Sequence, residues 1–173
     1  FNLNNKELIE IKTQNFDEYS LLLQNIYEYI NSPSSTISDI NIGNNMRRIL
    51  EAFGTFNYKC SIEGIAKNEE ILNKIDSLYR SYFKNSMYRL MLNSESHLKD
   101  RSRLILNTSF KEHFSEEEKR RTAKDILMFL YLLEPLHLKI HLKKDGSDTT
   151  IIISQIESWI TETFEVSLTP QIS

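Results

Sequence analysis

Apolar side chains recur at helical spacing between residues 45 and 56. Four of them follow one another at i, i+3, i+4 and i+7 and so share one face of a helix: Met46, Ile49, Leu50 and Phe53. Arg47 and Glu51 are four residues apart, so their side chains lie together on the opposite, more polar face. The pattern predicts an amphipathic helix that ends at about Phe56 and carries an arginine–glutamate pair.

Two further stretches show apolar residues at helical spacing. Asn15 is typical of an N-cap and opens a predicted helix over residues 15–30. A second helical stretch is predicted from about Asn68 to about Asn93, because its apolar residues return to one face over most of its length.

The C-terminal half also contains clear helix signals. Ser115 and Glu118 stand three residues apart, which is the pattern of a capping box. They predict a helix that runs to about Leu133 and that ends or kinks at Pro135. Residues 154–164 form another predicted helix, since their apolar side chains again fall on one face.

Two other stretches are strand-like. Residues 8–12 are predicted as a short strand. After Pro135, apolar and polar residues alternate as far as Leu142, and residues 149–153 are rich in β-branched side chains, which favours a hairpin. The alternative interpretation is a helix that begins at Pro135, because proline is well tolerated in the first helical turn. A small β-element near the C-terminus and a helix both remain open at this point.

The composition bounds the fold. The chain has 173 residues, of which 40% are apolar, and this is enough for one compact domain with a core. It contains only 4 glycines and 3 prolines, and this scarcity of helix breakers favours helices. We therefore predict a mostly α-helical bundle of four to five helices over residues 15–173, preceded by a connector over residues 1–14.

The composition also limits the compartment and the ligands. The single cysteine, Cys60, excludes an intrachain disulfide and fits a reducing cytosol. The chain begins at Phe1 and shows no signal peptide and no long apolar span, so we expect a fragment of a longer cytoplasmic protein without membrane contact. One cysteine and 4 histidines show no zinc spacing, so no metal site is predicted. The net charge of −3 does not indicate a general nucleic-acid coat.

A histidine follows the predicted helix end near Asn93. His97 is a candidate general acid or base, because an unperturbed imidazole titrates near neutrality. Together with Arg47 and Glu51 it forms a set that suits RNA cleavage, since RNA carries its own nucleophile, the ribose 2′-hydroxyl. A base removes the proton of that hydroxyl, an acid protonates the leaving 5′-oxygen, and a cation stabilises the phosphorane. The structural alternative is an exposed ion pair and a surface histidine.

The same residues carry a resemblance. The runs 47–53 and 93–97 resemble the C-terminal nuclease region of bacterial anticodon nucleases of the PrrC and RloC type. The pattern of that family is an arginine, a glutamate four residues later and a downstream Asn-x-x-x-His. In this chain it falls on Arg47, Glu51 and Asn93 to His97, and the resemblance extends over roughly residues 19 to 133.

This resemblance implies residue roles. Arg47, Glu51 and His97 would be catalytic, with Asn93 and Arg48 in support. Arg48 stands beside Arg47 and is the alternative for the working arginine, although only Arg47 has the i, i+4 spacing to Glu51. The implied fold is a HEPN-like helical ribonuclease domain. The implied reaction is metal-independent and leaves a 2′,3′-cyclic phosphate and a 5′-hydroxyl.

The resemblance also implies partners. The substrate would be RNA, specifically a tRNA anticodon loop, and the role would be bacteriophage defence. The connector would lead from an upstream ABC-type ATPase, which would bind ATP and Mg²⁺, while this fragment itself would need no cofactor. HEPN-like domains commonly pair, so a homodimer is expected. The alternative interpretation is a non-catalytic helical dimerisation or interaction module of such an ATPase.

Residues 99–124 are locally basic and follow His97 closely. We predict that five of these cations bind RNA phosphates: Lys99, Arg101, Arg103, Arg120 and Arg121. The alternative is a solvated helix face that is balanced by the acidic residues 116–118. Four aromatic residues are candidates for stacking on bases, with a core position as the alternative for each: Tyr79, Tyr82, Phe83 and Tyr88.

Overall fold

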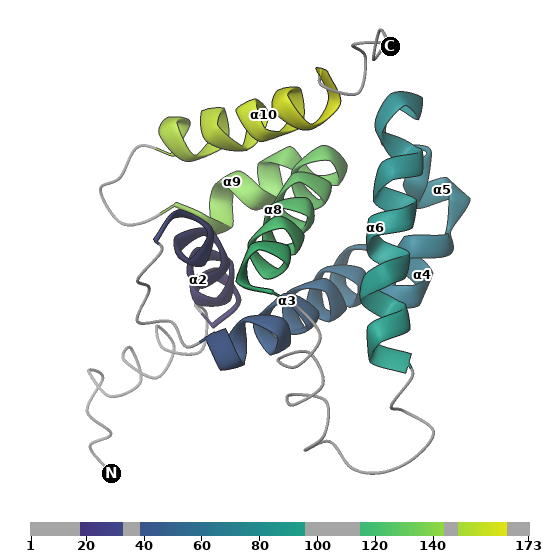
Figure 1. The fold of residues 1–173 in the computed structure, drawn as a ribbon. Helices are drawn as coiled ribbons and strands as arrows, with labels where there is room; N and C mark the ends of the chain where they lie inside the picture. Colours follow the sequence, from purple (N-terminus) through teal and green to yellow (C-terminus); the bar gives the residue numbers. More distant parts are fainter. Residues whose placement is uncertain (1–17, 33–38, 96–114, 144–148, 166–173) are drawn as a thin grey trace, which may run out of the picture.

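The computed structural model describes residues 18–32, 39–95, 115–143 and 149–165. In these ranges eight α-helices and one π-helical turn form a bundle (Figure 1). The helices are α2 (Glu18–Asn31), α3 (Asp39–Phe53), α4 (Ile62–Lys67), α5 (Glu69–Leu72), α6 (Ser77–Glu95), α8 (Glu116–Leu133), α9 (Pro135–His141) and α10 (Thr150–Glu165). The π-helical turn η1 (Gly54–Tyr58) follows α3 directly. The predicted mostly α-helical bundle is confirmed, with five long helices and three short ones.

Helix α8 is the centre of the bundle. It contacts α2, α3, α6, α9 and α10, and Figure 1 shows it in green between α10 above and α3 below. Six consecutive residues, from Asp125 to Leu130, are buried, so neighbours cover this part of the helix on all sides. The apolar face of α3 packs into the same core, with Ile49 and Phe53 fully buried. The helices therefore share one hydrophobic core.

The beginning of α8 is as the sequence predicts. The Ser115 hydroxyl accepts a hydrogen bond from the backbone N–H of Glu118 at 3.2 Å, and the Glu118 carboxylate accepts one from the N–H of Ser115 at 2.8 Å. These bonds satisfy two amides that the helix leaves unpaired, and they hold the pKa of Glu118 below its ordinary value. The helix ends at Leu133, so both predicted boundaries are confirmed.

The region after α8 is helical, so the hairpin alternative is wrong and the alternative of a helix that begins at Pro135 is confirmed. Pro135 occupies the first turn of α9, where its missing N–H costs nothing. The apolar residues that alternate in the sequence divide into two pairs at i, i+4: Leu138 and Leu142 are buried, whereas Leu136 and Ile140 are exposed. Alternation of apolar and polar residues over so short a stretch therefore fits either a strand or a helix. Packing of Leu138 and Leu142 against the core favours the helix.

The β-branched run after Asp148 is also helical. It forms the first turns of α10, which the sequence predicted to begin only at residue 154. Ile156, Trp159 and Ile160 lie on the buried side of this helix. Burial of these large side chains outweighs the weak strand preference of the isoleucines. No strand occurs in the part of the chain that the structure describes.

The stretch between α3 and α6 departs from the prediction in detail. Asn68 caps a helix as expected, because its side chain accepts from the N–H groups of residues 70 and 71, but this helix, α5, has only four residues. Asp76 then caps a new start, since its carboxylate accepts from the N–H of Leu78 at 2.9 Å. One predicted helix is thus two, α5 and α6, and α4 before them was not predicted.

Two predictions near the N-terminus lie outside the described residues, namely the strand over residues 8–12 and the N-cap Asn15. The described part of the first predicted helix agrees with the sequence, since α2 ends at Asn31.

Candidate functional site

Arg47 and Glu51 form the predicted pair on α3. Arg47 Nε donates to Glu51 Oε1 at 2.8 Å, on the face of α3 opposite the buried Ile49 and Phe53. The two side chains are 38% and 47% exposed, so water or a ligand can reach both. The bond uses only Nε, which leaves the two terminal amino groups of the guanidinium without a partner among the described residues. This arrangement presents one carboxylate and a two-pronged cation to solvent.

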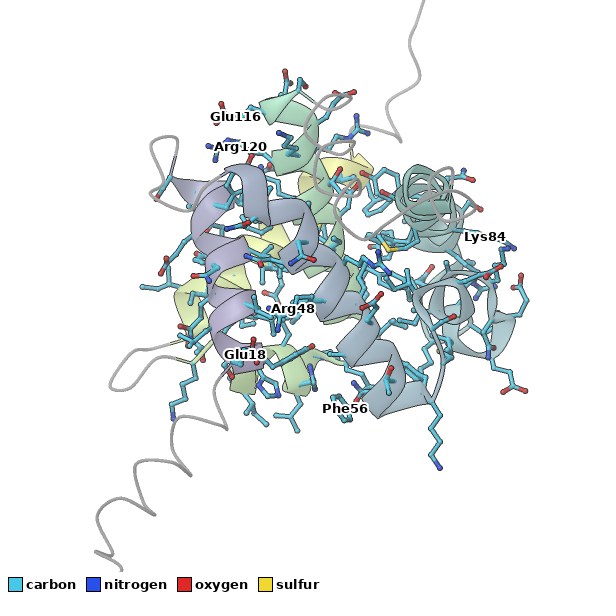
Figure 2. All side chains as sticks on the ribbon, turned by 90° about the horizontal axis from the view of Figure 1, so that it is seen from below. Glu18, Arg48, Phe56, Lys84, Glu116 and Arg120 are labelled. Atoms are coloured by element: carbon cyan, nitrogen blue, oxygen red, sulfur yellow. The ribbon has the colours of Figure 1, made fainter. Side chains whose placement is uncertain are left out.

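Arg48 points to a different part of the molecule. Its guanidinium donates to the Glu18 carboxylate at the beginning of α2, and Figure 2 shows the two residues meeting between α3 and α2. Side-chain exposures of 44% and 70% make this a surface pair. Arg48 therefore links two helices, while Arg47 pairs within its own helix. Local spacing carries no signal for the Glu18 contact, because the partners are 30 residues apart.

Several predicted site residues lie outside the described residues. They are His97, Lys99, Arg101 and Arg103. Asn93 belongs to α6 by its backbone, but its side chain is also outside the described residues. Of the predicted catalytic set, the structure therefore brings together Arg47 and Glu51.

Arg120, one of the predicted RNA-binding cations, is turned toward the fold. Its guanidinium donates to the backbone carbonyls of Tyr29, Ile30 and Ser32 at the end of α2. It also pairs with Glu116 at 2.6 Å, and it lies 4.7 Å from the centre of the Tyr29 ring. The last carbonyls of a helix lack intrahelical donors and carry partial negative charge, so this cation caps α2. These contacts argue against a phosphate-binding role for Arg120.

Arg121 is exposed but is close to a buried carboxylate. Asp125 on α8 is 5% exposed and accepts from the Tyr82 hydroxyl at 2.7 Å and from the Ser86 hydroxyl at 2.5 Å. Burial, and then the hydrogen bond to Asp125, raise the pKa of Tyr82 to about 12. Arg121 hydrogen-bonds with the Tyr82 hydroxyl, and this contact raises the pKa of the guanidinium further. The cluster joins α6 to α8.

The aromatic candidates for base stacking have mostly core positions. Phe83 is fully buried, and the rings of Tyr79 and Tyr82 lie 4.4 Å and 5.1 Å from that of Phe164 on α10. Tyr79 and Tyr82 are half-buried in these contacts. The side chain of Tyr88 is outside the described residues.

A pair of histidines joins α9 to α2. His137 Nε2 is 2.9 Å from the Tyr19 hydroxyl, and His141 Nδ1 is 2.9 Å from the Ser20 hydroxyl. The two imidazole centres are 4.5 Å apart, and the ring of Phe53 meets His137 edge-on. Both histidines pack between the two helices, and neither belongs to the predicted catalytic set. Their spacing of four residues is visible in the sequence, but their partners are more than a hundred residues away.

This environment changes the acidity of His137. Burial and then the neighbouring His141 lower the pKa of the His137 imidazole to about 4, while Glu134 acts in the opposite direction. A neutral His137 at physiological pH is consistent with a contact that holds two helices together.

Glu134, between α8 and α9, accepts hydrogen bonds from side chains of two other segments. Its carboxylate accepts from Lys74 Nζ at 2.8 Å and from the Tyr58 hydroxyl at 2.9 Å. The bond to Lys74 lowers the pKa of Glu134, and burial together with the Glu134 contact raises the pKa of Tyr58. This cluster fastens the end of η1 to the beginning of α9.

Two searches of the described ranges were negative. They contain no group of three or more histidine, cysteine, aspartate and glutamate side chains placed to hold a metal ion. None of the helices in these ranges combines the length and the apolar character that crossing a membrane requires.

Comparisons of the chain with protein-family models, with curated proteins and with solved structures find no match. A functional assignment therefore depends on the chemistry of the residues themselves.

Proposed function

We propose that this chain is a metal-independent endoribonuclease that uses Arg47 and Glu51 at its active site. The observation that supports the proposal is the pair itself: a guanidinium and a carboxylate 2.8 Å apart, both about half exposed, on a helix that the core holds firmly. Among the described residues the Arg47 terminal amino groups have no partner, so they could bind two oxygens of one phosphate, which is the geometry that stabilises a crowded phosphorane.

The reaction that this set suits is a transesterification within the RNA strand. The 2′-oxygen forms a bond to phosphorus while the bond from phosphorus to the 5′-oxygen breaks. A base takes the proton of the 2′-hydroxyl, and an acid gives a proton to the leaving 5′-oxygen. Glu51 and His97 would share these two tasks, and Arg47 would stabilise the charge on the phosphorane. The products would be a 2′,3′-cyclic phosphate and a 5′-hydroxyl.

The proposal extends to the biological setting that the resemblance to anticodon nucleases implies. The substrate would be a tRNA anticodon loop, and the cleavage would serve bacteriophage defence in the cytoplasm. An upstream ABC-type ATPase would control the domain, and two copies would pair. Arg121 with the cations of residues 99–103 would bind phosphates, whereas Arg48, which pairs with Glu18, has no part in the proposed site.

The second candidate is a non-catalytic helical interaction module. One observation favours it: Leu136 and Ile140 are 69% and 59% exposed and lie one turn apart on α9, as in a helix that binds a partner. Under this alternative the Arg47–Glu51 pair is only an exposed ion pair, which contributes about 0.5 kcal/mol or less.

The deciding experiment is single-turnover cleavage of a purified tRNA pool by variants of the pair. We expect Arg47→Ala and Glu51→Gln to slow cleavage by about 10²- to 10³-fold with unchanged melting, because each removes a preorganised charge. The chain supplies a matched control in Glu63 and Lys67 on α4, an i, i+4 pair with exposures of 52% and 54%. The control variants Lys67→Ala and Glu63→Gln should cleave the tRNA pool at the rate of the parent chain. Normal cleavage by Arg47→Ala would favour the interaction module.

Two further tests address the mechanism. His97→Ala should abolish cleavage without unfolding the chain. Cleavage should persist in EDTA and should fail on RNA with a 2′-deoxy sugar at the cut site, because the nucleophile is then absent. Strict dependence on a divalent ion, or cleavage of the deoxy substrate, would contradict the proposed chemistry.

A further inference from the structure

The π-helical turn η1 changes where Phe56 points. Phe56 comes three residues after Phe53, which is fully buried on the apolar face of α3. An uninterrupted α-helix keeps residues three apart on one face, so it would carry position 56 toward the core. Instead Phe56 is 84% exposed, the highest value among the large apolar residues of the described ranges. The wider turn therefore rotates this ring out of the apolar face.

The turn that displays Phe56 is fixed by its backbone. Gly54 is buried, and a β-carbon there would lie 2.6 Å from Ile65 Cδ1, so no other residue fits without a shift. Asn57 Nδ2 donates to the carbonyl of Phe53 at 3.1 Å. Lys59 ends the turn in the left-handed region, with a φ of 52°, and its N–H donates back into the turn. A fixed backbone restricts where the exposed ring can go.

The residue that follows the exposed part of the turn anchors it to the body of the protein. The Tyr58 ring meets Phe53 edge-on at 5.7 Å, and its hydroxyl donates to Glu134. Lys74 Nζ lies 4.8 Å from the centre of the Tyr58 ring. The turn therefore directs Tyr58 toward the body of the protein and Phe56, two residues earlier, toward solvent.

The neighbours of Phe56 in the chain are polar. Thr55, Asn57 and Lys59 are all exposed. A protein-binding hot spot lies among neighbouring contacts that together exclude water, and Phe56 is the one exposed large apolar residue of η1. A single aromatic ring among polar groups, with the exposed Lys59 beside it, is instead typical of sites that bind unpaired nucleotides.

We propose that Phe56 is a stacking residue for an unpaired RNA base. This inference rests on the proposed function, since it takes RNA as the ligand, and it deepens that function by selecting single-stranded over paired RNA. In a duplex the face of each base is covered by its neighbours, so the ring can reach only an unstacked base. The active-site pair Arg47–Glu51 is on the same helix, one to two turns before η1.

The test measures binding separately from cleavage. The probe is a fluorescent 12-nucleotide single strand with 2′-O-methyl sugars, which cannot be cut because its nucleophile is blocked, and the readout is anisotropy with the full chain. Phe56→Ala and Phe56→Leu should weaken binding by about 5- to 150-fold, the range that loss of one stacked base produces. Phe56→Trp should bind normally, and its indole fluorescence should be quenched by the probe. The same probe in a duplex should show no difference between variants.

A control variant and the melting curve complete the experiment. Ile151 on α10 is 74% exposed, so Ile151→Ala removes a comparable exposed apolar side chain elsewhere and should leave binding unchanged. All variants at position 56 should melt like the parent chain, since the ring is outside the core. Equal binding by Phe56→Ala and the parent chain would overturn the inference. The inference would also be overturned if Phe56→Ala left RNA binding unchanged but altered the oligomeric state in solution, because Phe56 would then be a protein contact.

The two proposals can fail separately. Phe56-dependent binding without any RNA cleavage would support the stacking role and contradict the nuclease. Arg47-dependent cleavage that Phe56→Ala leaves unchanged in rate and affinity would do the reverse. Failure of the parent chain to bind the single strand at all would overturn the stacking inference.

Discussion

Two arginines of this molecule, Arg47 and Arg120, each form an ion pair with a glutamate one helical turn away, but they differ in exposure and in their other hydrogen bonds. Arg47 on α3 uses one nitrogen for Glu51 and is 38% exposed. Arg120 on α8 is 20% exposed and divides its donors between Glu116 and the carbonyls at the end of α2. The same residue types at the same spacing thus give a solvent-facing pair in one case and a structural cap in the other.

The comparison teaches that the spacing of an arginine and a glutamate along a helix predicts their contact. It does not predict what the other N–H groups of the guanidinium bind. A guanidinium has five N–H groups, and one carboxylate cannot use them all. In Arg120 the surplus donors satisfy backbone carbonyls of another helix, so the residue is part of the fold. In Arg47 the surplus donors have no partner among the described residues and the side chain is 38% exposed, so a ligand can reach them.

The largest expected effect is on chemistry at position 47. Arg47→Lys keeps the positive charge but loses the two-pronged contact to phosphate oxygens, so we expect cleavage to fall by roughly 10²-fold. Single-turnover cleavage rates measure this effect, and the melting curve should not change. A lysine variant that cuts at the parent rate would mean that any cation suffices there.

The next largest effect is on stability at position 120. Arg120→Ala leaves the carbonyls at the end of α2 without their donor and should cost about 1–3 kcal/mol. For a domain of this size the melting temperature should fall by roughly 2–12 °C. Glu116→Ala is the matched control: it removes the ion pair but keeps the cap, so its cost should be about 1 kcal/mol or less. Equal effects of the two variants would show that the cap contributes nothing.

An acid titration examines a third contact, the histidine pair between α9 and α2. The pKa of His137 is about 4 in the fold and near 6.5 in an unfolded chain, so the unfolded state binds an extra proton between these values. Stability from this group is therefore complete above pH 6.5 and is lost as the pH falls toward 4. Melting temperatures at half-unit steps should decline in this window, and His137→Gln should make the decline shallower. An identical decline in the variant would assign it to carboxylates such as Glu134.

The smallest expected effect is on stability at position 47. Arg47→Ala should cost about 0.5 kcal/mol or less, as should Lys67→Ala at the comparable pair on α4, because exposed pairs contribute little. Denaturant unfolding of both variants provides the measurement. If Arg47→Ala lost more than about 1 kcal/mol of unfolding free energy and Lys67→Ala did not, Arg47 would have a structural role like that of Arg120.

The sequence predicted what depends on neighbours within one or two helical turns. The apolar stripe of α3, the Arg47–Glu51 contact and the capping box at Ser115 were all correct, because each is set by local spacing. The end of α3 was not, because the π-helical turn depends on the close fit of Gly54 against Ile65. Local patterns do not report such a fit.

Contacts between distant segments also escaped prediction. Arg120 meets carbonyls 88 to 91 residues earlier, and His137 meets a hydroxyl 118 residues earlier. Nothing in the run around Arg120 distinguishes a cap from a phosphate ligand, so the predicted RNA-binding role was drawn from charge alone. The choice between a hairpin and a helix for residues 135–142 stayed open for a related reason, since burial of Leu138 and Leu142 is decided by the core and not by their own spacing.

The cap that Arg120 places on α2 has a consequence for synthesis of the chain. Helix α2 is the first described helix, yet Arg120, His137 and His141 come about 90 to 120 residues later. At ribosomal rates of about 5–20 residues per second, roughly 5–25 s pass before these partners emerge. During that interval α2, whose 14 residues are only marginally helical alone in water, can pack against α3 but not yet against α8 and α9. The apolar side of α2 that includes Leu23 and Ile26 is then only partly covered, so the nascent chain exposes apolar surface that a holding chaperone can bind.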